Sequence, residues 1–427
     1  MRDHSKHIVL TRDEAVTTML KVVEFSPSSR LVPLDHRAAG LTLAEDAKAQ
    51  VNTPNVLTCA MDSIAVHWSD FAGLAAGELP DTSQWVRGEQ WQFANTGVAM
   101  PEGFDTAIVI EHVQVSADEQ KVTIDAAPSK QFAGTRAVAS ELAMGDTLAS
   151  AGTRLTPDLL AHLAQGGLRQ LEVVAAPRVA FIPTGGELIP VAATPQLGKN
   201  TETNSVLIAA KIAQWGGEPV IFPIIPDDPE QIEAAVKTAC ADCDIVVLNA
   251  GSSKGSEDWS CEELDKIGRV LCHETTHGPG HHSSYAIVDG TPVVGISGPP
   301  GGASPTTSFY VKPLIQKWFG RDSAPHRLKV KLAAEFKGHK PAPAQPGVPA
   351  RGEDRPFAAQ AGDDKPFYRI SFLKLSQDVE GTVWAEPISG HPGVSKAVSA
   401  DAIYMKPNGP EAPVLEVGDV LEAELLD

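Results

Sequence analysis

The hydrophobic and polar positions of this chain have their clearest pattern between residues 178 and 259. Short apolar runs rich in β-branched residues alternate there with segments that have the spacing and composition of helices. The predicted strands are 179–182, 220–225 and 245–248, and the predicted helices between them are 206–215 and 230–240. This β-α-β-α-β order predicts a parallel sheet with right-handed crossovers.

A turn rich in glycine or aspartate follows each of these strands, at residues 183–188, 226–229 and 249–258. Ligands of open parallel sheets bind beyond the carboxyl ends of the strands, where all three turns should lie. Gly251 and Gly255 would let backbone N–H groups approach an anion, and a helix expected to begin near Glu257 would direct its positive end there. The spacing is not that of a Walker loop, and simple turn chemistry is the alternative to an anion site.

The pattern changes on both sides of this segment. Residues 11–23 predict an amphipathic helix, in which Thr11 and Glu14 form a capping box. From residue 51 to about 174, short alternating runs predict small β domains with one helix at 157–166. After Arg321 the chain is β-rich again, and residues 338–366 read as a long solvated loop. We therefore predict an α/β and β multidomain protein with a central parallel sheet.

Composition narrows the function. A chain of 427 residues is too long for one core, so two to four domains are expected. The formal net charge of −19 argues against nucleic-acid binding and requires any anion site to be local. We expect a cytoplasmic protein, because no segment has the length of a membrane span and no signal peptide begins the chain. The five cysteines suit reduced thiols, and the Cys240 and Cys243 pair lacks a second pair for zinc.

Several motifs, in their order and spacing, resemble those of one protein family. Residues 60–66 read Ala-Met-Asp-Ser-Ile-Ala-Val, and residues 95–105 read Asn-Thr-Gly-Val-Ala-Met-Pro-Glu-Gly-Phe-Asp. The turns at 183–188, 226–229 and 249–258 follow, and then Gly-Ile-Ser-Gly-Pro-Pro at 295–300. Over essentially its whole length the chain resembles the molybdenum insertases, which are molybdopterin molybdotransferases related to the E domain of gephyrin.

The resemblance implies a fold, a reaction and partners. The expected subunit has a linking domain (1–50 and 146–176), a small β domain with the Met-Asp signature (51–145), a molybdopterin-binding-like α/β domain (177–320) and a barrel-like C-terminal β domain (321–427). It implies a homodimer whose active site lies between the α/β domain of one subunit and the small β domain of the other. There, molybdate would enter adenylylated molybdopterin, with magnesium present and AMP released. The molybdopterin adenylyltransferase and recipient apoenzymes are the implied partners.

The resemblance also implies site residues. The catalytic set would be Asp62, Thr96, Glu187, Asp228 and Asp258, of which Glu187, Asp228 and Asp258 supply the hard oxygen ligands that Mg²⁺ prefers. The residues expected to bind molybdopterin or the oxyanion are Gly251, Ser252, Ser253, Lys254, Gly255, Gly280, His281, Gly298 and Arg136. Structural roles are the alternative: Asp62 and Asp258 as caps, one of Asp227 and Asp228 as a turn residue, and Arg136 as the partner of Glu141.

The chain departs from the family where charge matters most. The family's Lys-Pro-Gly-Lys-Pro reads Gly-Pro-Gly-His-His at residues 278–282, so both lysines are absent. His277, His281 and His282 are the nearest replacements as partial cations, unless Lys254 compensates. A metal site at these histidines is disfavoured against a flexible loop. Ser63, Ile64 and the prolines at 299–300 are further departures.

These departures leave three hypotheses open. The first, which we favour because the carboxylates are retained, is an insertase for molybdenum or tungsten. The second is a paralogue that binds or carries molybdopterin without catalysis. The third is a pterin or nucleotide hydrolase that uses Asp228 and Asp258 with magnesium.

Overall fold

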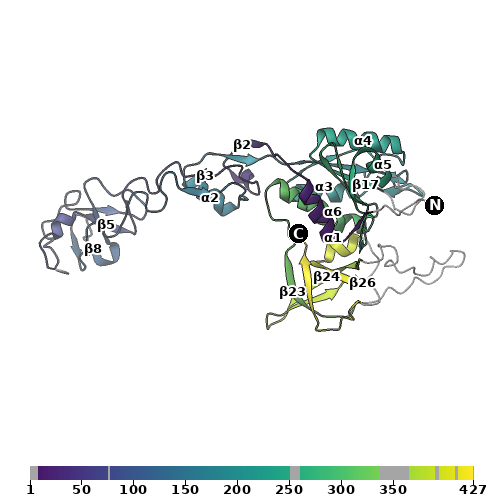
Figure 1. Cartoon of the computed structure of the whole chain (residues 1–427). Coiled ribbons are helices and arrows are strands. Elements are labelled where there is room, and N and C mark those ends of the chain that lie inside the picture. Colours follow the sequence, from purple (N-terminus) through teal and green to yellow (C-terminus); the bar gives the residue numbers. More distant parts are fainter. Residues whose placement is uncertain are drawn as a thin grey trace. The chain divides into compact units, whose positions relative to one another are not determined.

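The computed structural model describes residues 8–75, 77–250, 260–336, 365–389, 394–408 and 412–426. Contacts divide the chain into two compact units. Residues 29–174 form one unit, and residues 1–28 together with 175–427 form the other. Each unit is described by itself (Figure 1).

The larger unit is built on a six-stranded sheet with the strand order β16-β13-β17-β22-β21-β18. Its strands are β13 (Arg178–Pro183), β16 (Glu218–Ile221), β17 (Ile245–Ala250), β18 (Arg269–Cys272), β21 (Ser284–Val288) and β22 (Thr291–Ser297). The first four strands in the sheet order are parallel to one another. The strand β21 is antiparallel to both of its neighbours, β22 and β18. The predicted β-α-β-α-β order is confirmed, although the strand predicted at 220–225 ends at Ile221.

Helices cover both faces of this sheet, which explains its continuously apolar central strands. They are α3 (Asn204–Gln214), α4 (Pro229–Asp242), α5 (Ser260–Ile267) and α6 (Pro300–Trp318). Ala180 and Ile182 pack in one cluster with Val236 of α4 and Leu264 of α5. The alternate strand position, Val179, lies beside α3. The strand residues 179–182 and 245–248 are fully buried, so they anchor the turns that follow them.

The helix α1 (Arg12–Val22) belongs to this larger unit. It begins with the predicted capping box, in which the Thr11 hydroxyl accepts from the Glu14 N–H and the Glu14 carboxylate accepts from the Thr11 N–H. At its other end, Leu20 accepts a hydrogen bond from Lys317 of α6. Residues 8–28 thus group with the α/β sheet, whereas we expected residues 1–50 in the linking domain.

The C-terminal strands form a barrel beside the α/β sheet. They are β23 (Arg327–Leu332), β24 (Phe367–Gln377), β25 (Val383–Pro387), β26 (Ala402–Asn408) and β27 (Val420–Leu425), with α7 (Val394–Ser399) before β26. Pairing of β24 with both β25 and β26 closes the ring around Val330, Leu332 and Leu373. The barrel-like C-terminal domain is confirmed. A two-residue strand, β20 (His277–Gly278), pairs with β24.

The smaller unit contains short strands around separate cores. One core lies under α2 (Pro157–Gln165), β2 (Ser29–Pro33) and β12 (Gln170–Val174) and includes Leu43 and Leu163. Another lies under a three-stranded sheet and includes Ile64 and Trp91. The other strands of the unit are β3 (Ala47–Lys48), β4 (Thr58–Cys59), β5 (Ser63–Val66), β6 (Trp91–Ala94), β7 (Thr106–Val109), β8 (Val113–Val115), β9 (Val122–Ile124), β10 (Thr135–Arg136) and β11 (Thr147–Ala149).

Four short strands and three 3-10 helices complete the description. The strands β1 (Val9–Leu10) and β19 (Glu274–Thr275) pair in parallel, as do β14 (Leu188–Ile189) and β15 (Asn200–Thr201). The 3-10 helices are η1 (His36–Ala38), η2 (Trp68–Phe71) and η3 (Ile110–His112). No helix in the described ranges is long and apolar enough to cross a membrane. The loop predicted at 338–366 lies almost wholly outside the described residues.

Candidate functional site

Hydrogen bonds join the turns that follow β13 and β16 to each other, and join the first of them to Asn249 near the end of β17. The Thr184 N–H and hydroxyl both donate to the Asn249 carbonyl, at 3.2 and 2.8 Å. The Gly185 N–H donates to the Ile225 carbonyl at 3.1 Å, and the Gly186 N–H donates to Asp227 Oδ2 at 2.7 Å. The turns therefore meet at the carboxyl edge of the sheet, as the strand order predicts.

A buried amide network extends this edge to the end of β22. Asn204, the first residue of α3, donates from Nδ2 to Asn249 Oδ1 and to the Gly298 carbonyl, both at 2.7 Å. Asn249 in turn donates from Nδ2 to the Ser297 carbonyl at 3.1 Å. Asn204 and Asn249 are 5% and 3% exposed. Sequence reasoning missed Asn204, and the signal was a polar residue at the start of a helix that follows the first turn.

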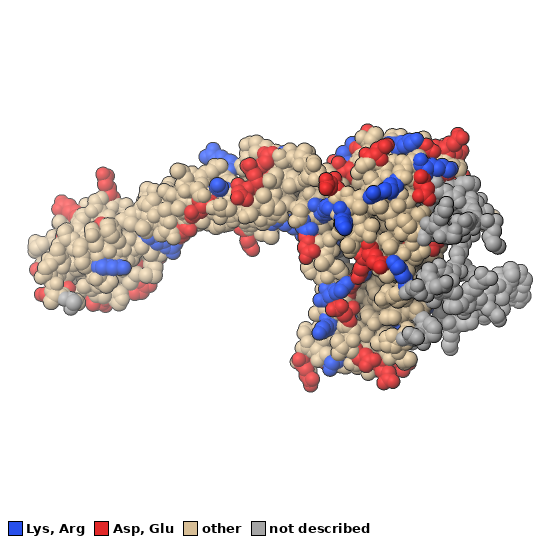
Figure 2. Space-filling model, viewed as in Figure 1, with Lys and Arg blue, Asp and Glu red and all other residues tan. Residues whose placement is uncertain are grey.

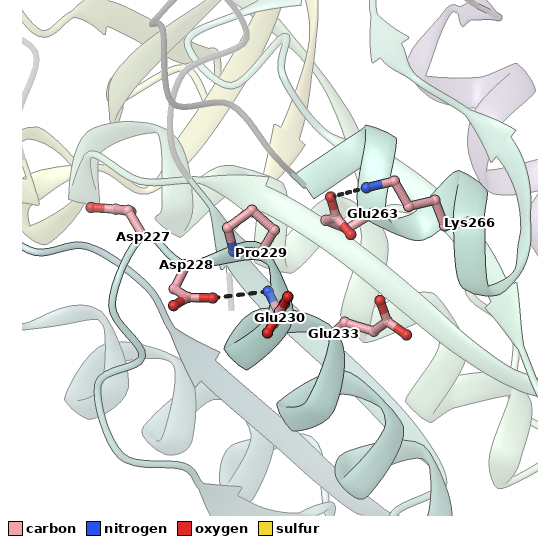
Figure 3. A pocket seen from close by; sticks show the side chains of 7 residues that line it. All are labelled: Asp227, Asp228, Pro229, Glu230, Glu233, Glu263 and Lys266. Atoms are coloured by element: carbon pink, nitrogen blue, oxygen red, sulfur yellow. Dashed lines mark hydrogen bonds and ion pairs between the residues drawn. The ribbon is translucent and has the colours of Figure 1, made fainter.

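An acidic pocket of about 590 Å³ lies beside the second turn (Figure 3). Its lining residues are Asp227, Asp228, Pro229, Glu230, Glu233, Glu263 and Lys266. Glu263 is buried and pairs with Lys266 at 2.5 Å. The pocket thus concentrates negative charge around the first turn of α4.

Asp228 is the N-cap of α4. Its Oδ1 accepts from the Glu230 and Gln231 N–H groups at 2.9 and 3.2 Å, and its Oδ2 accepts from Gln231 Nε2 at 3.0 Å. The Gln231 side chain, followed by its backbone N–H, lowers the pKa of Asp228, so this carboxylate is ionised at neutral pH. Asp228 therefore caps α4, and Asp227 ties two turns together, whereas the sequence had left one of the two as a turn residue and had not considered Asp228 as a cap.

Glu187 does not line this pocket. A Cβ added at Gly185 would lie 2.6 Å from Glu187 Oε2, so the Glu187 carboxylate lies over the turn that Gly185 makes. Lys199 donates to the Gly186 carbonyl at 2.6 Å and helps to hold the same turn. Among the described residues, no group of three or more His, Cys, Asp or Glu side chains is arranged to enclose a metal ion.

The segment with the histidines packs against the start of α6. Gly280 has φ +99°, and a Cβ there would lie 2.3 Å from Thr306 Cγ2 and 3.5 Å from the Gly302 carbonyl. A Cβ at Gly302 would in turn approach Ser297 Oγ and the Gly280 nitrogen, at 2.9 and 3.4 Å. Gly280 and Gly298 therefore lie at neighbouring positions on the carboxyl edge.

His277 is not the partial cation that we expected. It is fully buried, and its Nε2 lies 2.6 Å from the Tyr310 hydroxyl. Burial, helped by the charge of Arg12, lowers the pKa of His277 to about 3, so the ring is neutral at physiological pH. His281 and His282 are half-buried, with ring centroids 3.5 Å apart. The segment is therefore packed against the sheet and α6, and His277 contributes no charge.

The C-terminal barrel, and not His277, places basic residues near this segment. Arg369 of β24 is the register partner of Gly278, where the family resemblance leads one to expect lysine. Lys406 of β26 lies opposite Arg369, and burial together with the charge of Arg369 lowers the pKa of Lys396 in α7. Within the described parts of the chain, none of these three cations forms an ion pair. Elsewhere, acidic and basic side chains are interspersed over the visible face of each unit (Figure 2).

The predicted site residues of the smaller unit, Asp62, Thr96 and Arg136, take part in two sets of contacts. Asp62 Oδ1 accepts from the Thr96 N–H and hydroxyl at 2.9 and 3.0 Å, and both residues are exposed. The Thr96 N–H, followed by the hydroxyl, lowers the pKa of Asp62. Arg136 pairs with Glu141 at 2.6 Å, which is the structural role considered for it.

The glycine-rich loop lies outside the described residues. This applies to Gly251, Ser252, Ser253, Lys254, Gly255 and Asp258. The Cys240 and Cys243 pair is described, and burial raises the pKa of Cys240 to about 12. Burial also raises the pKa of Cys243, so both thiols stay protonated, which disfavours redox or metal chemistry at this pair.

Two family models match the chain. The MoeA N-terminal region, domains I and II, matches residues 10–167, and the probable molybdopterin binding domain matches residues 180–317. A molybdopterin molybdenumtransferase of Haemophilus influenzae is 28% identical over 321 residues, which are 73% of this chain and 78% of that protein. The Bacillus subtilis protein of the same name is 30% identical over 250 residues, 58% of each chain.

Solved structures show the same fold. The crystal structure of a MoeA molybdopterin biosynthesis protein from Pyrococcus horikoshii aligns with a TM-score of 0.74. The alignment covers 98% of this chain and 99% of that protein at 20% sequence identity. This likeness extends across the α/β sheet, the barrel and the smaller unit.

Proposed function

We propose, because this chain belongs to the MoeA family of molybdopterin molybdenumtransferases, that it inserts molybdate into adenylylated molybdopterin and releases AMP. The observation that carries the proposal is the carboxyl edge of the α/β sheet. Two turns, two buried asparagines and the start of α6 are joined there by direct contacts. Such an edge is where open α/β sheets bind their ligands.

The substrates are anions, so the proposal needs local cations in a chain with net charge −19. Arg369 meets this need as the register partner of Gly278, and Lys406 and Lys396 add positive charge around Arg369. We propose that these residues replace the positive charge of the family's two lysines from neighbouring elements. We propose that they attract molybdate and the phosphate groups, with His281 as a weaker contributor.

Magnesium is the metal that the family implies. Mg²⁺ is commonly held by one or two carboxylates together with water and substrate phosphate, so it does not need an all-protein cage. The oxygen-rich pocket around Asp227 and Asp228 fits that requirement. We propose that these carboxylates would hold the ion, and that Glu187, on the neighbouring turn outside the pocket lining, and Asp258 would complete its ligands with water and substrate phosphate. When bound, Mg²⁺ would neutralise charge on the phosphates during the release of AMP.

The smaller unit contributes the second half of the proposed site. Asp62 keeps its Oδ2 available, because Thr96 donates both of its hydrogen bonds to Oδ1. In the proposed homodimer, Asp62 and Thr96 of one subunit face the α/β edge of the other and orient molybdate. We place the reaction in the cytoplasm, with the adenylyltransferase and recipient apoenzymes as partners.

The decisive experiment measures AMP release together with binding. Purified protein is mixed with adenylylated molybdopterin, molybdate and Mg²⁺, and AMP and metal-loaded cofactor are quantified by chromatography. We expect both products, and neither without molybdate. Calorimetric binding of the substrate with no AMP release would refute the enzyme and indicate a carrier. Release of AMP from ATP or other nucleotides at a similar rate would indicate a general hydrolase.

A further inference from the structure

One side-chain oxygen of the buried amide network, Asn204 Oδ1, has no hydrogen-bond donor among the described residues. The Nδ2 of Asn204 uses both hydrogens, on Asn249 Oδ1 and the Gly298 carbonyl. Its Oδ1 is buried and has no hydrogen-bond partner among the residues that the structure describes. Buried polar atoms of native proteins are nearly always paired, so this acceptor requires an explanation.

The orientation of the Asn204 amide is fixed by its neighbours. Asn249 donates from Nδ2 to the Ser297 carbonyl, so its Oδ1 must be the atom that faces Asn204. Turning the Asn204 amide by 180° would set its Oδ1 against the Gly298 carbonyl and Asn249 Oδ1, which are both acceptors. The relay from Ser297 through Asn249 therefore holds Asn204 Oδ1 in its unpaired position.

The backbone around Asn204 is also held in place. The preceding strand β15 pairs with β14, which directly follows the Thr184 to Glu187 turn. The buried Glu202 accepts from the Ser205 N–H at 3.0 Å, and the Glu202 N–H donates to the Ile189 carbonyl at 2.8 Å. The unpaired oxygen is thus presented by a rigid segment at the carboxyl edge, where we propose that substrate binds.

The chemistry of an amide oxygen restricts what it can bind. It accepts from N–H or O–H donors, and it repels phosphate or molybdate oxygens. Of the groups on the proposed substrate, the pterin ring carries N–H donors on its pyrimidinone ring and amino group. We propose that Asn204 Oδ1 accepts a hydrogen bond from a pterin N–H and thereby sets the orientation of the ring at this edge. This inference rests on the proposed function and adds a specificity-determining residue to it.

Two substitutions separate this role from a structural one. Asn204→Leu and Asn204→Ala both remove the acceptor and the donors, and Leu roughly keeps the side-chain volume. We expect calorimetry to show molybdopterin binding weakened at least about tenfold by each of them. AMP affinity should stay within about twofold in both, because AMP lacks the pterin ring. An equal loss of affinity for AMP would overturn the inference, since the substitutions would then act through the fold of this edge.

A test on the unaltered protein covers the case in which either variant fails to fold. Competition for molybdopterin is measured with 6-hydroxymethylpterin and with the same pterin methylated at its ring nitrogen and amino group. We expect the methylated compound to compete at least about tenfold more weakly, and an Asn204→Ala variant to reduce that difference. Equal competition by the two pterins, or unchanged binding by Asn204→Leu, would mean that the oxygen faces only water. Failure of the unaltered protein to bind molybdopterin at all would instead remove the proposed function, and this inference with it.

Discussion

Substituting Gly280 by alanine tests whether the histidine segment is fixed against α6 as the structure indicates. Two separate penalties act at this position. The backbone has φ +99°, which side chains with a Cβ rarely adopt, and the new Cβ would lie 2.3 Å from Thr306 Cγ2. Thr306 cannot turn aside easily, because its buried hydroxyl donates to the Gly302 carbonyl at 2.7 Å.

The magnitudes follow from these two contacts. The backbone conformation costs about 1–2 kcal/mol for alanine. Overpacking of a buried site costs about 1–3 kcal/mol more. We therefore expect Gly280→Ala to lower the free energy of unfolding by about 2–5 kcal/mol. Gly290 provides a matched control, since it has φ +86° and a Cβ there would meet no atom within 4 Å.

Differential scanning calorimetry of the full chain measures the effect through the thermal midpoint of the larger unit. The expected order is unaltered protein, then Gly290→Ala, then Gly280→Ala with the lowest midpoint. Adding Thr306→Ser removes Cγ2 and should bring the cost of Gly280→Ala close to that of Gly290→Ala. Equal midpoints for the two glycine variants, or no rescue by Thr306→Ser, would refute the packing described for this segment.

Three further predictions concern charge. Asp228→Asn should keep the helix cap and change the free energy of unfolding by less than about 0.5 kcal/mol at pH 7, while it reduces Mg²⁺-dependent AMP release. Asp228→Ala should reduce AMP release and also lower the free energy of unfolding by about 1 kcal/mol, because the cap is lost. Because the folded-state pKa of Asp228 is lowered, the extra stability from its ionised carboxylate is present above about pH 4 and is lost as the pH falls through that pKa. The difference in urea midpoint between the unaltered protein and Asp228→Asn at pH 7 should therefore shrink at pH 3. His281→Lys should raise AMP affinity about threefold or more in low salt and less at 0.5 M salt. Gly278→Lys should raise AMP affinity less than His281→Lys, because its Cβ would lie 3.1 Å from Phe367. Equal gains in affinity at both salt concentrations would contradict a charge effect. Molybdate or phosphate should raise the thermal midpoint of unfolding of the unaltered protein, and the rise should be smaller in Lys406→Gln. A rise of the same size in both proteins would exclude Lys406 from the anion site.

Periodicity was enough to predict three of the six strands of the α/β sheet and the two helices between them, because these elements follow from local sequence. The apolar strands, the helical spacing and the Thr11 capping box depend on residues a few positions apart. The strand order then placed the turns after Ile182, Ile225 and Leu248 at one edge. That inference needed only the handedness rule for parallel strands.

The contacts within the site could not be predicted in this way. The burial of His277 depends on Tyr310 of α6, which lies 33 positions further along the chain. The placement of Arg369 beside Gly278 depends on the register of β24, which local sequence does not determine. The choice between capping and metal binding at Asp228 likewise depends on side-chain geometry. Asn204 was missed because the sequence shows a polar residue at the start of a helix but not that one of its atoms lacks a partner.

The charge arrangement links these observations to the choice between an enzyme and a carrier. Arg369 and Lys406 lie directly opposite each other, and like charges in that position are destabilising in a sheet. The lowered pKa of Lys396 has burial as its first cause and the charge of Arg369 as its second. A strongly acidic chain could neutralise such a cluster with nearby carboxylates, yet the described residues do not pair with it. The retained repulsion beside the substituted lysine positions therefore supports the proposal that these cations replace the missing lysines in an insertase with an altered phosphate contact.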